Sequence, residues 1–112
     1  MTFEEFDRAA RGLPAVTVDT PFGPFPVYKV GGRMFALSVD GRASLKVTDI
    51  AFEVLTEAGR AIPAPYLFRA KWVQFDDLAQ VDAAEMGDWL RTAHALVAAK
   101  LTRKARADLG LA

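Results

Sequence analysis

The fold of this chain is decided by residues 25–47, which read FPVYKVGGRMFALSVDGRASLKV. Three runs rich in β-branched and aromatic residues are separated there by two dipeptides, Gly31-Gly32 and Asp40-Gly41. Both dipeptides suit the two-residue hairpin turns that require positive φ, and such turns join neighbouring antiparallel strands. The stretch therefore predicts an antiparallel meander of three strands, at Phe25–Val30, Arg33–Val39 and Arg42–Val47.

Helix signals lie on both sides of this meander. Thr2 followed by Glu5 is a capping-box pattern, and the apolar spacing behind it predicts a first helix at about Phe3–Arg11. After the meander, Asp49 is suited to cap a second helix at about Ile50–Ala58. The meander is therefore expected to have one helix before it and another directly after it.

The remaining segments predict one further strand and a long helix. Pro21–Pro26 is a stiff, extended segment that leads into the meander, and Arg60–Pro65 is a loop. Aromatic and branched residues predict a strand at Tyr66–Phe75, and apolar spacings of three and four predict a last helix at Ala83–Arg106. The fold class is therefore α+β: an antiparallel sheet, with the N-terminal, middle and long C-terminal helices packed on one face.

Composition narrows the class of protein. The chain of 112 residues is expected to form a single domain, residues 1–112, large enough to bury a core. Fourteen basic residues balance fourteen acidic ones, so the protein is not one that grips duplex DNA by bulk charge. Cysteine is absent, which excludes disulfides and thiolate metal sites. No stretch is typical of a secretory signal or membrane span, so we expect a cytoplasmic protein without a membrane partner.

Several short motifs follow one another along nearly the whole chain, at Gly31–Ala36, Leu45-Lys46, Pro65-Tyr66, Lys71–Val73 and Thr92–Leu101. In this order they resemble the MmcQ/YjbR-like family of small bacterial proteins. The resemblance implies a frataxin-like α+β fold, and members of this family have been considered for DNA binding through a double-wing arrangement. The sequence departs from the family at Ala93-His94, where many members have a Ser-Tyr pair.

Basic and aromatic residues are interleaved along the predicted strands, with Asp40 in a turn as the one acid of the meander. Such a surface can bind a nucleic acid, because phosphates need positive partners and bases need flat apolar ones. Strand alternation directs Lys29 and Lys46 away from their apolar neighbours, and therefore outward. The alternative is that these bases only keep one face of the sheet soluble. The candidate nucleic-acid-binding residues are Lys29, Arg33, Arg42, Lys46, Arg69, Lys71 and Trp72.

Alternation leaves both faces of the Tyr66–Phe75 segment open as the core side. If Trp72 is exposed beside Arg69 and Lys71, it can stack on a base; if it is buried, it is a core residue. We expect burial, because an aromatic residue within a strand usually packs. His94 is the one histidine of the chain, and without cysteine or a second histidine it predicts a packed helix residue rather than a metal ligand.

No catalytic or cofactor motif is visible in the sequence, so we expect a non-catalytic binding module that acts as a monomer and needs no cofactor. Nucleic acid is the partner that the basic strands indicate. The competing hypothesis is a protein- or small-ligand-binding domain that uses a pocket between the meander and the loop at residues 60–66. An enzyme would instead require titratable groups that converge in a cleft around His94.

Overall fold

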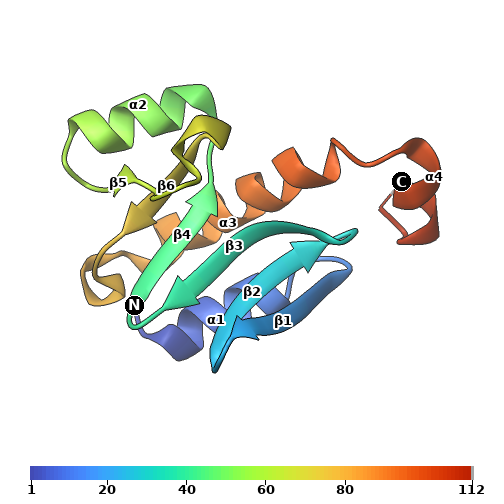
Figure 1. The fold of residues 1–112 in the computed structure, drawn as a ribbon, viewed down its shortest axis with the longest axis horizontal. Coiled ribbons are helices and arrows are strands. Elements are labelled where there is room, and N and C mark those ends of the chain that lie inside the picture. Colours follow the sequence, from blue (N-terminus) through green and yellow to red (C-terminus); the bar gives the residue numbers. More distant parts are fainter. Residues whose placement is uncertain (112) are drawn as a thin grey trace.

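The computed structural model describes residues 1–111 and has the predicted α+β fold (Figure 1). Within these residues one six-stranded sheet has the order β1-β2-β3-β4-β6-β5, and each neighbouring pair is antiparallel. The strands are β1 (Val16–Phe22), β2 (Phe25–Val30), β3 (Arg33–Val39), β4 (Arg42–Lys46), β5 (Ile62–Pro63) and β6 (Trp72–Phe75). The helices are α1 (Phe3–Arg11), α2 (Asp49–Glu57), α3 (Ala83–Ala98) and α4 (Arg103–Asp108), with short 3₁₀ helices η1 (Phe68–Ala70) and η2 (Leu78–Gln80).

Helices α1 and α3 cover one face of the sheet and leave the other face open (Figure 1). Phe6 of α1 meets the ring of Tyr28 edge-on at 5.7 Å between ring centroids. His94 of α3 meets Phe35 in the same way at 5.4 Å, and all four of these rings are buried. Helix α2 contacts β5 and β6 at one edge of the sheet. The core therefore lies between the sheet and the α1–α3 pair.

The two hairpin turns of the meander are confirmed. Gly31 and Gly32 have φ values of 58° and 79°, and Asp40 and Gly41 have 50° and 76°. Positive φ at both central residues is the geometry whose twist matches that of antiparallel strands. The three predicted strands are therefore present, and the third ends at Lys46, one residue earlier than expected.

The meander contains one irregularity, in β3. Tyr28 pairs with Ala36 and the next residue of β2, Lys29, pairs with Met34, so Phe35 is an extra residue on its strand. This β-bulge places Phe35 and Ala36 together on the core side, where both are fully buried. Met34 consequently lies on the open face with Lys29, its cross-strand partner.

Strand β1 is missing from the sequence prediction, which has only an extended lead-in around the prolines. Val16–Phe22 forms an edge strand that pairs with β2, and its register shifts between Asp19 and Phe22. Pro21 lies inside this shift, and an edge position or a bulge is where a strand tolerates proline because no ladder N–H is needed. The prolines of this segment therefore do not exclude a strand, although they made the strand hard to predict from the sequence.

The predicted strand at Tyr66–Phe75 is wrong in its first part. Tyr66 and Lys71 have positive φ values of 66° and 61°, which interrupt an extended backbone, and the 3₁₀ helix η1 lies between them. Only Trp72–Phe75 is a strand. The preceding loop contains the short strand β5, which pairs with β6 and was not predicted.

Two helix boundaries also differ from the prediction. Helix α2 is capped by Thr48, whose hydroxyl accepts the N–H of Ala51 at 3.1 Å, and not by Asp49. The last helix is divided: α3 ends at Ala98, and the side chain of Thr102 caps a separate helix, α4. Figure 1 shows that α4 extends away from the sheet, so we call residues 99–111 the C-terminal arm.

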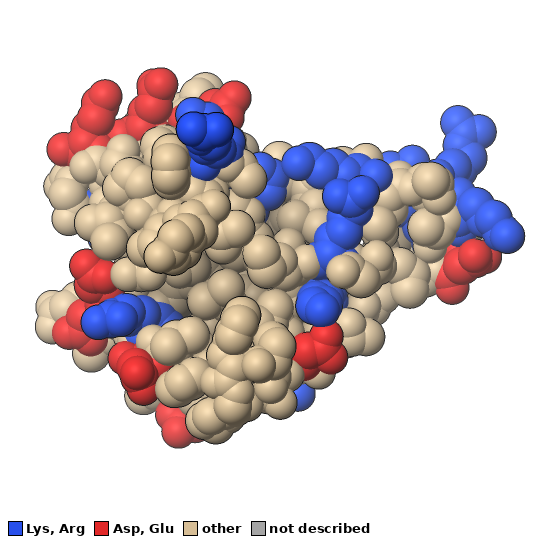
Figure 2. Space-filling view, viewed as in Figure 1, with Lys and Arg blue, Asp and Glu red and all other residues tan. Residues whose placement is uncertain are grey.

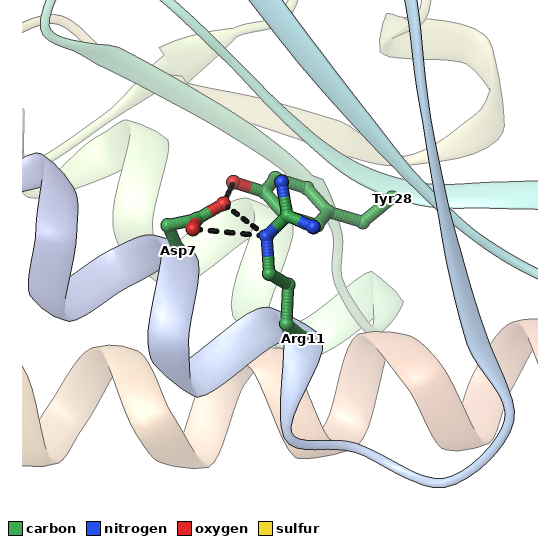
Figure 3. Close-up of polar contacts among 3 residues, drawn as sticks. All are labelled: Asp7, Arg11 and Tyr28. Atoms are coloured by element: carbon green, nitrogen blue, oxygen red, sulfur yellow. Dashed lines mark hydrogen bonds and ion pairs between the residues drawn. The ribbon is translucent and has the colours of Figure 1, made fainter.

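A polar contact joins α1 to the sheet (Figure 3). The hydroxyl of Tyr28 donates to a carboxylate oxygen of Asp7 at 2.7 Å, and the Nε–H of Arg11 donates to both carboxylate oxygens at 2.9 Å. Burial, followed by the bond to Asp7, raises the pKa of Tyr28 far above its ordinary value. These three residues satisfy one another and fix α1 over β2. No helix in the described part of the chain is long and apolar enough to cross a membrane.

Candidate functional site

Two of the predicted basic site residues do not contribute to a shared site, one because of its position and one because it is paired. Arg42 follows the β3–β4 turn, whereas Arg33 begins β3, so the length of the strand, roughly 20 Å, separates their backbones. Lys29 is on the open face of the sheet as predicted, but its ammonium pairs with the carboxylate of Asp19 at 2.7 Å. Neither residue adds free positive charge to a shared site.

Arg33 and Lys46 come together at the other end of the sheet, where β3 begins and β4 ends. There they line a pocket of about 280 Å³ together with Lys100, which follows the end of α3. We call this the basic pocket. Its remaining lining residues are Met34, Leu67, Ala70, Trp72 and Val97.

Lys46 is the most enclosed cation of the basic pocket. It lies opposite Trp72 in the β4–β6 ladder, and its ammonium donates to the backbone carbonyl of Ala70. Burial lowers the pKa of Lys46, the positive charge of Lys100 lowers it further, and the carboxylate of Asp49 acts in the opposite direction. An anion bound beside Lys46 would offset both destabilising effects.

The segment that contains η1 brings two further predicted bases close to the basic pocket, because Leu67 and Ala70 of the same segment line it. Arg69 is exposed. Lys71 is half-buried, and its ammonium lies 4.8 Å from the centre of the Phe52 ring on α2, a cation–π contact. Arg69 and Lys71 are therefore sequence neighbours of residues that line the pocket, but neither of them lines it.

Among residues 1–111 none of the cations at this end of the sheet forms an ion pair with a carboxylate, although Asp49 lies close enough to favour the charge of Lys46. The ion pairs within residues 1–111 all lie elsewhere in the molecule, and they join Arg11 to Asp7, Lys29 to Asp19, Arg60 to Glu85 and Arg91 to Asp88. We call the five unpaired residues the basic end of the sheet. Its members are Arg33, Lys46, Arg69, Lys71 and Lys100.

The C-terminal arm continues the positive surface. Figure 2 shows that Lys and Arg side chains gather on the open face along the side that leads to α4, whereas Asp and Glu lie mainly elsewhere. The arm carries Arg103, Lys104 and Arg106. Lys100 and these three residues are missing from the sequence-predicted site, because their position in the last turns of a single long helix suited the helix dipole.

The predicted burial of Trp72 is confirmed, since only 3% of the residue is exposed. A ring in this position has no open face on which a base could stack, so Trp72 contributes a wall of the pocket and not a stacking platform. The one exposed tyrosine nearby is Tyr66, at 99%. Any contact with a flat ligand on the surface would therefore have to use residues other than Trp72.

His94 is a packed helix residue, as predicted. It is 7% exposed, and its Nε2 lies 2.8 Å from the carbonyl oxygen of Pro14. Because a carbonyl oxygen only accepts hydrogen bonds, Nε2 carries the hydrogen and the ring is held between α3 and the segment after α1. Among residues 1–111 no group of three or more histidine, aspartate or glutamate side chains is placed to hold a metal ion.

A second pocket, of about 320 Å³, lies beside the loop that the competing hypothesis identified. It is lined by residues 59–62, by Gln74 and Phe75 of β6, and by the following Asp76 and Asp77. Arg60 in its wall is already paired with Glu85 at 2.9 Å. We call it the loop pocket. Its charge is opposite to that of the basic pocket.

The model of the YjbR family matches residues 11–96 of this chain. The chain belongs to the YjbR family. The crystal structure of Deinococcus radiodurans protein DR2400, which carries the domain DUF419, superposes with a TM-score of 0.83 at 32% identity. That comparison covers 99% of this chain and 89% of the other, so the resemblance seen in the sequence is confirmed over almost the full length of this YjbR protein. No curated protein matches the chain.

Proposed function

We propose that this YjbR protein is a non-catalytic module that binds nucleic acid through phosphates, using the basic end of its sheet. The observation that carries the proposal is the convergence of Arg33, Lys46 and Lys100 on one pocket without a carboxylate partner in residues 1–111. Like charges are costly to hold together, and a phosphate supplies the missing counter-charge. We further propose that the protein acts as a cytoplasmic monomer and needs no cofactor.

The distribution of charge supports this proposal more than the total charge does. The chain is neutral overall, with fourteen basic and fourteen acidic residues. Asp7 of α1 is paired with Arg11, whereas the basic end and the arm together carry eight cations. Local asymmetry of this kind creates a positive potential that attracts a polyanion even when the net charge is zero.

The binding of short labelled oligonucleotides, single- and double-stranded, measured by fluorescence anisotropy at several salt concentrations, tests the proposal. Affinity should fall with salt at a log–log slope of roughly −0.7 to −0.9 for each phosphate contacted. Lys46→Gln should weaken binding, whereas Arg42→Gln, which removes the same charge at the far end of the sheet, should leave it nearly unchanged. Absence of binding at low salt for both kinds of oligonucleotide would refute the proposal.

The loop pocket supports a second candidate, a domain that binds a protein or a small ligand without nucleic acid. Its size suits a small ligand or a single inserted side chain, and Asp76 and Asp77 would favour a positively charged one. Asp76→Asn together with Asp77→Asn would abolish such binding. The same double variant should not reduce oligonucleotide binding, so the two candidates are separable.

A further inference from the structure

We infer that the basic pocket is a site for one phosphate-bearing nucleotide, with the phosphate held by Arg33, Lys46 and Lys100 and the remainder of the nucleotide against the apolar wall. The inference rests on the proposed function in using the same cations, and it adds a ligand class to them. The nucleotide could be free in solution or could stand at the end of a strand. Both sources offer the same chemistry, a phosphate monoester on a compact, partly apolar body.

The three cations that line the pocket form a positive rim that suits a phosphate monoester. Its three cations come from β3, from the end of β4 and from the residue that follows α3 by two positions, so the fold and not a local sequence run assembles them. A phosphate monoester carries up to two negative charges and three free oxygens, which suits several donors that approach from different sides. An internal phosphodiester carries one charge and offers fewer oxygens to such a rim.

The apolar wall of the pocket suits the body of a nucleoside. Met34, Leu67 and Val97 line the same pocket, and Trp72 closes its base with 3% of its surface exposed. A site for inorganic phosphate alone gains nothing from such a wall, whereas a nucleoside body buries apolar surface against it. The volume of about 280 Å³ lies near the lower limit of small-molecule sites, roughly 300 Å³, which favours a single nucleotide over a larger ligand.

Lys46 is held in place by the fold before a ligand binds. Its ammonium donates one hydrogen bond to the Ala70 carbonyl, so the other N–H groups of the ammonium point elsewhere. Lys100 lies close enough to repel the charge of Lys46. A lysine held in this way is already ordered before a ligand arrives. Its immobilisation therefore adds little to the entropic cost of binding.

Calorimetric titration of the full chain with adenosine monophosphate, adenosine and inorganic phosphate tests the inference. The monophosphate should bind at least roughly tenfold more tightly than either of its two parts, because it uses both the rim and the wall. Equal affinity for the monophosphate and inorganic phosphate would overturn the inference, since the wall would then contribute nothing. A 5′-phosphorylated oligonucleotide compared with its 5′-hydroxyl form shows whether the end of a strand is the preferred source.

A variant that keeps every charge separates this inference from the proposed function. Ala70→Leu places a larger side chain at an exposed residue that lines the pocket, and Ala79→Leu makes the same change at an exposed residue of η2 away from it. We expect Ala70→Leu to lose binding of the monophosphate while salt-dependent oligonucleotide binding persists. Lys46→Gln should weaken both, and it provides the test if Ala70→Leu does not fold.

The outcomes of these titrations are distinguishable. Oligonucleotide binding without any affinity for the monophosphate would refute the nucleotide site and leave the proposed function standing. Binding of the monophosphate without affinity for oligonucleotides would support the site and refute the proposed function. Undiminished monophosphate binding by Ala70→Leu would place the ligand outside the basic pocket and overturn the inference.

Discussion

Two groups of charged residues in this protein differ in where their partners are. Around Tyr28, the carboxylate of Asp7 accepts hydrogen bonds from the tyrosine hydroxyl and from Arg11, so each group is satisfied within the fold. At the basic end of the sheet, Arg33 and Lys100 approach Lys46 without a carboxylate partner in the described residues. The first group explains how α1 is held on the sheet, and the second is the surface through which we propose that a phosphate binds.

The largest expected effect comes from removing the unpaired charges together. The triple variant Arg33→Gln, Lys46→Gln and Lys100→Gln should weaken oligonucleotide binding by roughly a hundredfold at low salt and make the log–log salt slope shallower by about 2 to 3. Its unfolding free energy should change by no more than about 1 kcal/mol, because repulsion is relieved as contacts are lost. Anisotropy titrations and urea unfolding measure the two quantities. A strongly destabilised triple variant would show that these cations are structural.

The satisfied group should respond in the opposite way. Tyr28→Phe removes a buried hydroxyl and leaves Asp7 with one hydrogen-bond partner fewer, so the unfolding free energy should fall by about 1–2 kcal/mol. Oligonucleotide affinity should not change. Urea unfolding monitored by circular dichroism checks the first expectation, and Tyr66→Phe, at a residue that is 99% exposed, is the matched control. Equal stability of the two variants would contradict the role given to the Tyr28 hydroxyl.

Alkaline pH separates the two groups without mutation. The folded state raises the pKa of Tyr28 above its ordinary value of 10.0, so above that pH the unfolded chain releases a proton that the folded protein keeps. The contribution of Tyr28 to stability is therefore complete below about pH 10 and is lost progressively as the pH rises. Unfolding free energy measured between pH 8 and about 11 should fall less steeply in Tyr28→Phe than in the wild type. Parallel curves for the two proteins would contradict a raised pKa of Tyr28 in the folded state.

The smallest effect on binding and stability is expected from a change at Lys29. This residue is positively charged like the basic end of the sheet, but it has an ion-pair partner, Asp19, as Arg11 has in Asp7. Lys29→Gln should change stability by no more than about 0.5 kcal/mol, because its ion pair with Asp19 is partly exposed to solvent, at 30% and 56% of the two side chains. Oligonucleotide affinity should also remain within about twofold of the wild type, since this charge is already neutralised. A loss as large as that of Lys46→Gln would extend the binding surface toward β2.

Local signals in the sequence were sufficient for part of the fold. The meander follows from two dipeptides that tolerate positive φ, and α1 follows from its capping box, which is present in the structure. Strand β1 could not be predicted, because Pro21 is allowed only by an irregular register that no local pattern reveals. The break before α4 was missed because the apolar stripe of the predicted helix continues to Leu101 and no glycine or proline marks the end of α3.

The candidate site was harder to predict, because it is made by residues from distant elements. Arg33 and Lys46 were among the predicted residues, but nothing local distinguished them from Arg42 at the opposite end. Lys100 joins them only because α3 runs beneath the sheet and ends beside β3 and β4. The prediction also relied on a continuous strand through Arg69 and Lys71, and η1 replaces that strand.

The bulge at Phe35 determines which side chains reach each face of the sheet. If β3 kept its residues but paired with β2 by simple alternation from Ala36, Phe35 would turn to the open face and Met34 toward α1 and α3, away from the wall that it shares with Lys46. Phe35 would at the same time leave its contact with His94. The bulge therefore sets the core and the pocket wall together, so we expect related chains that keep the pocket to keep the bulge as well.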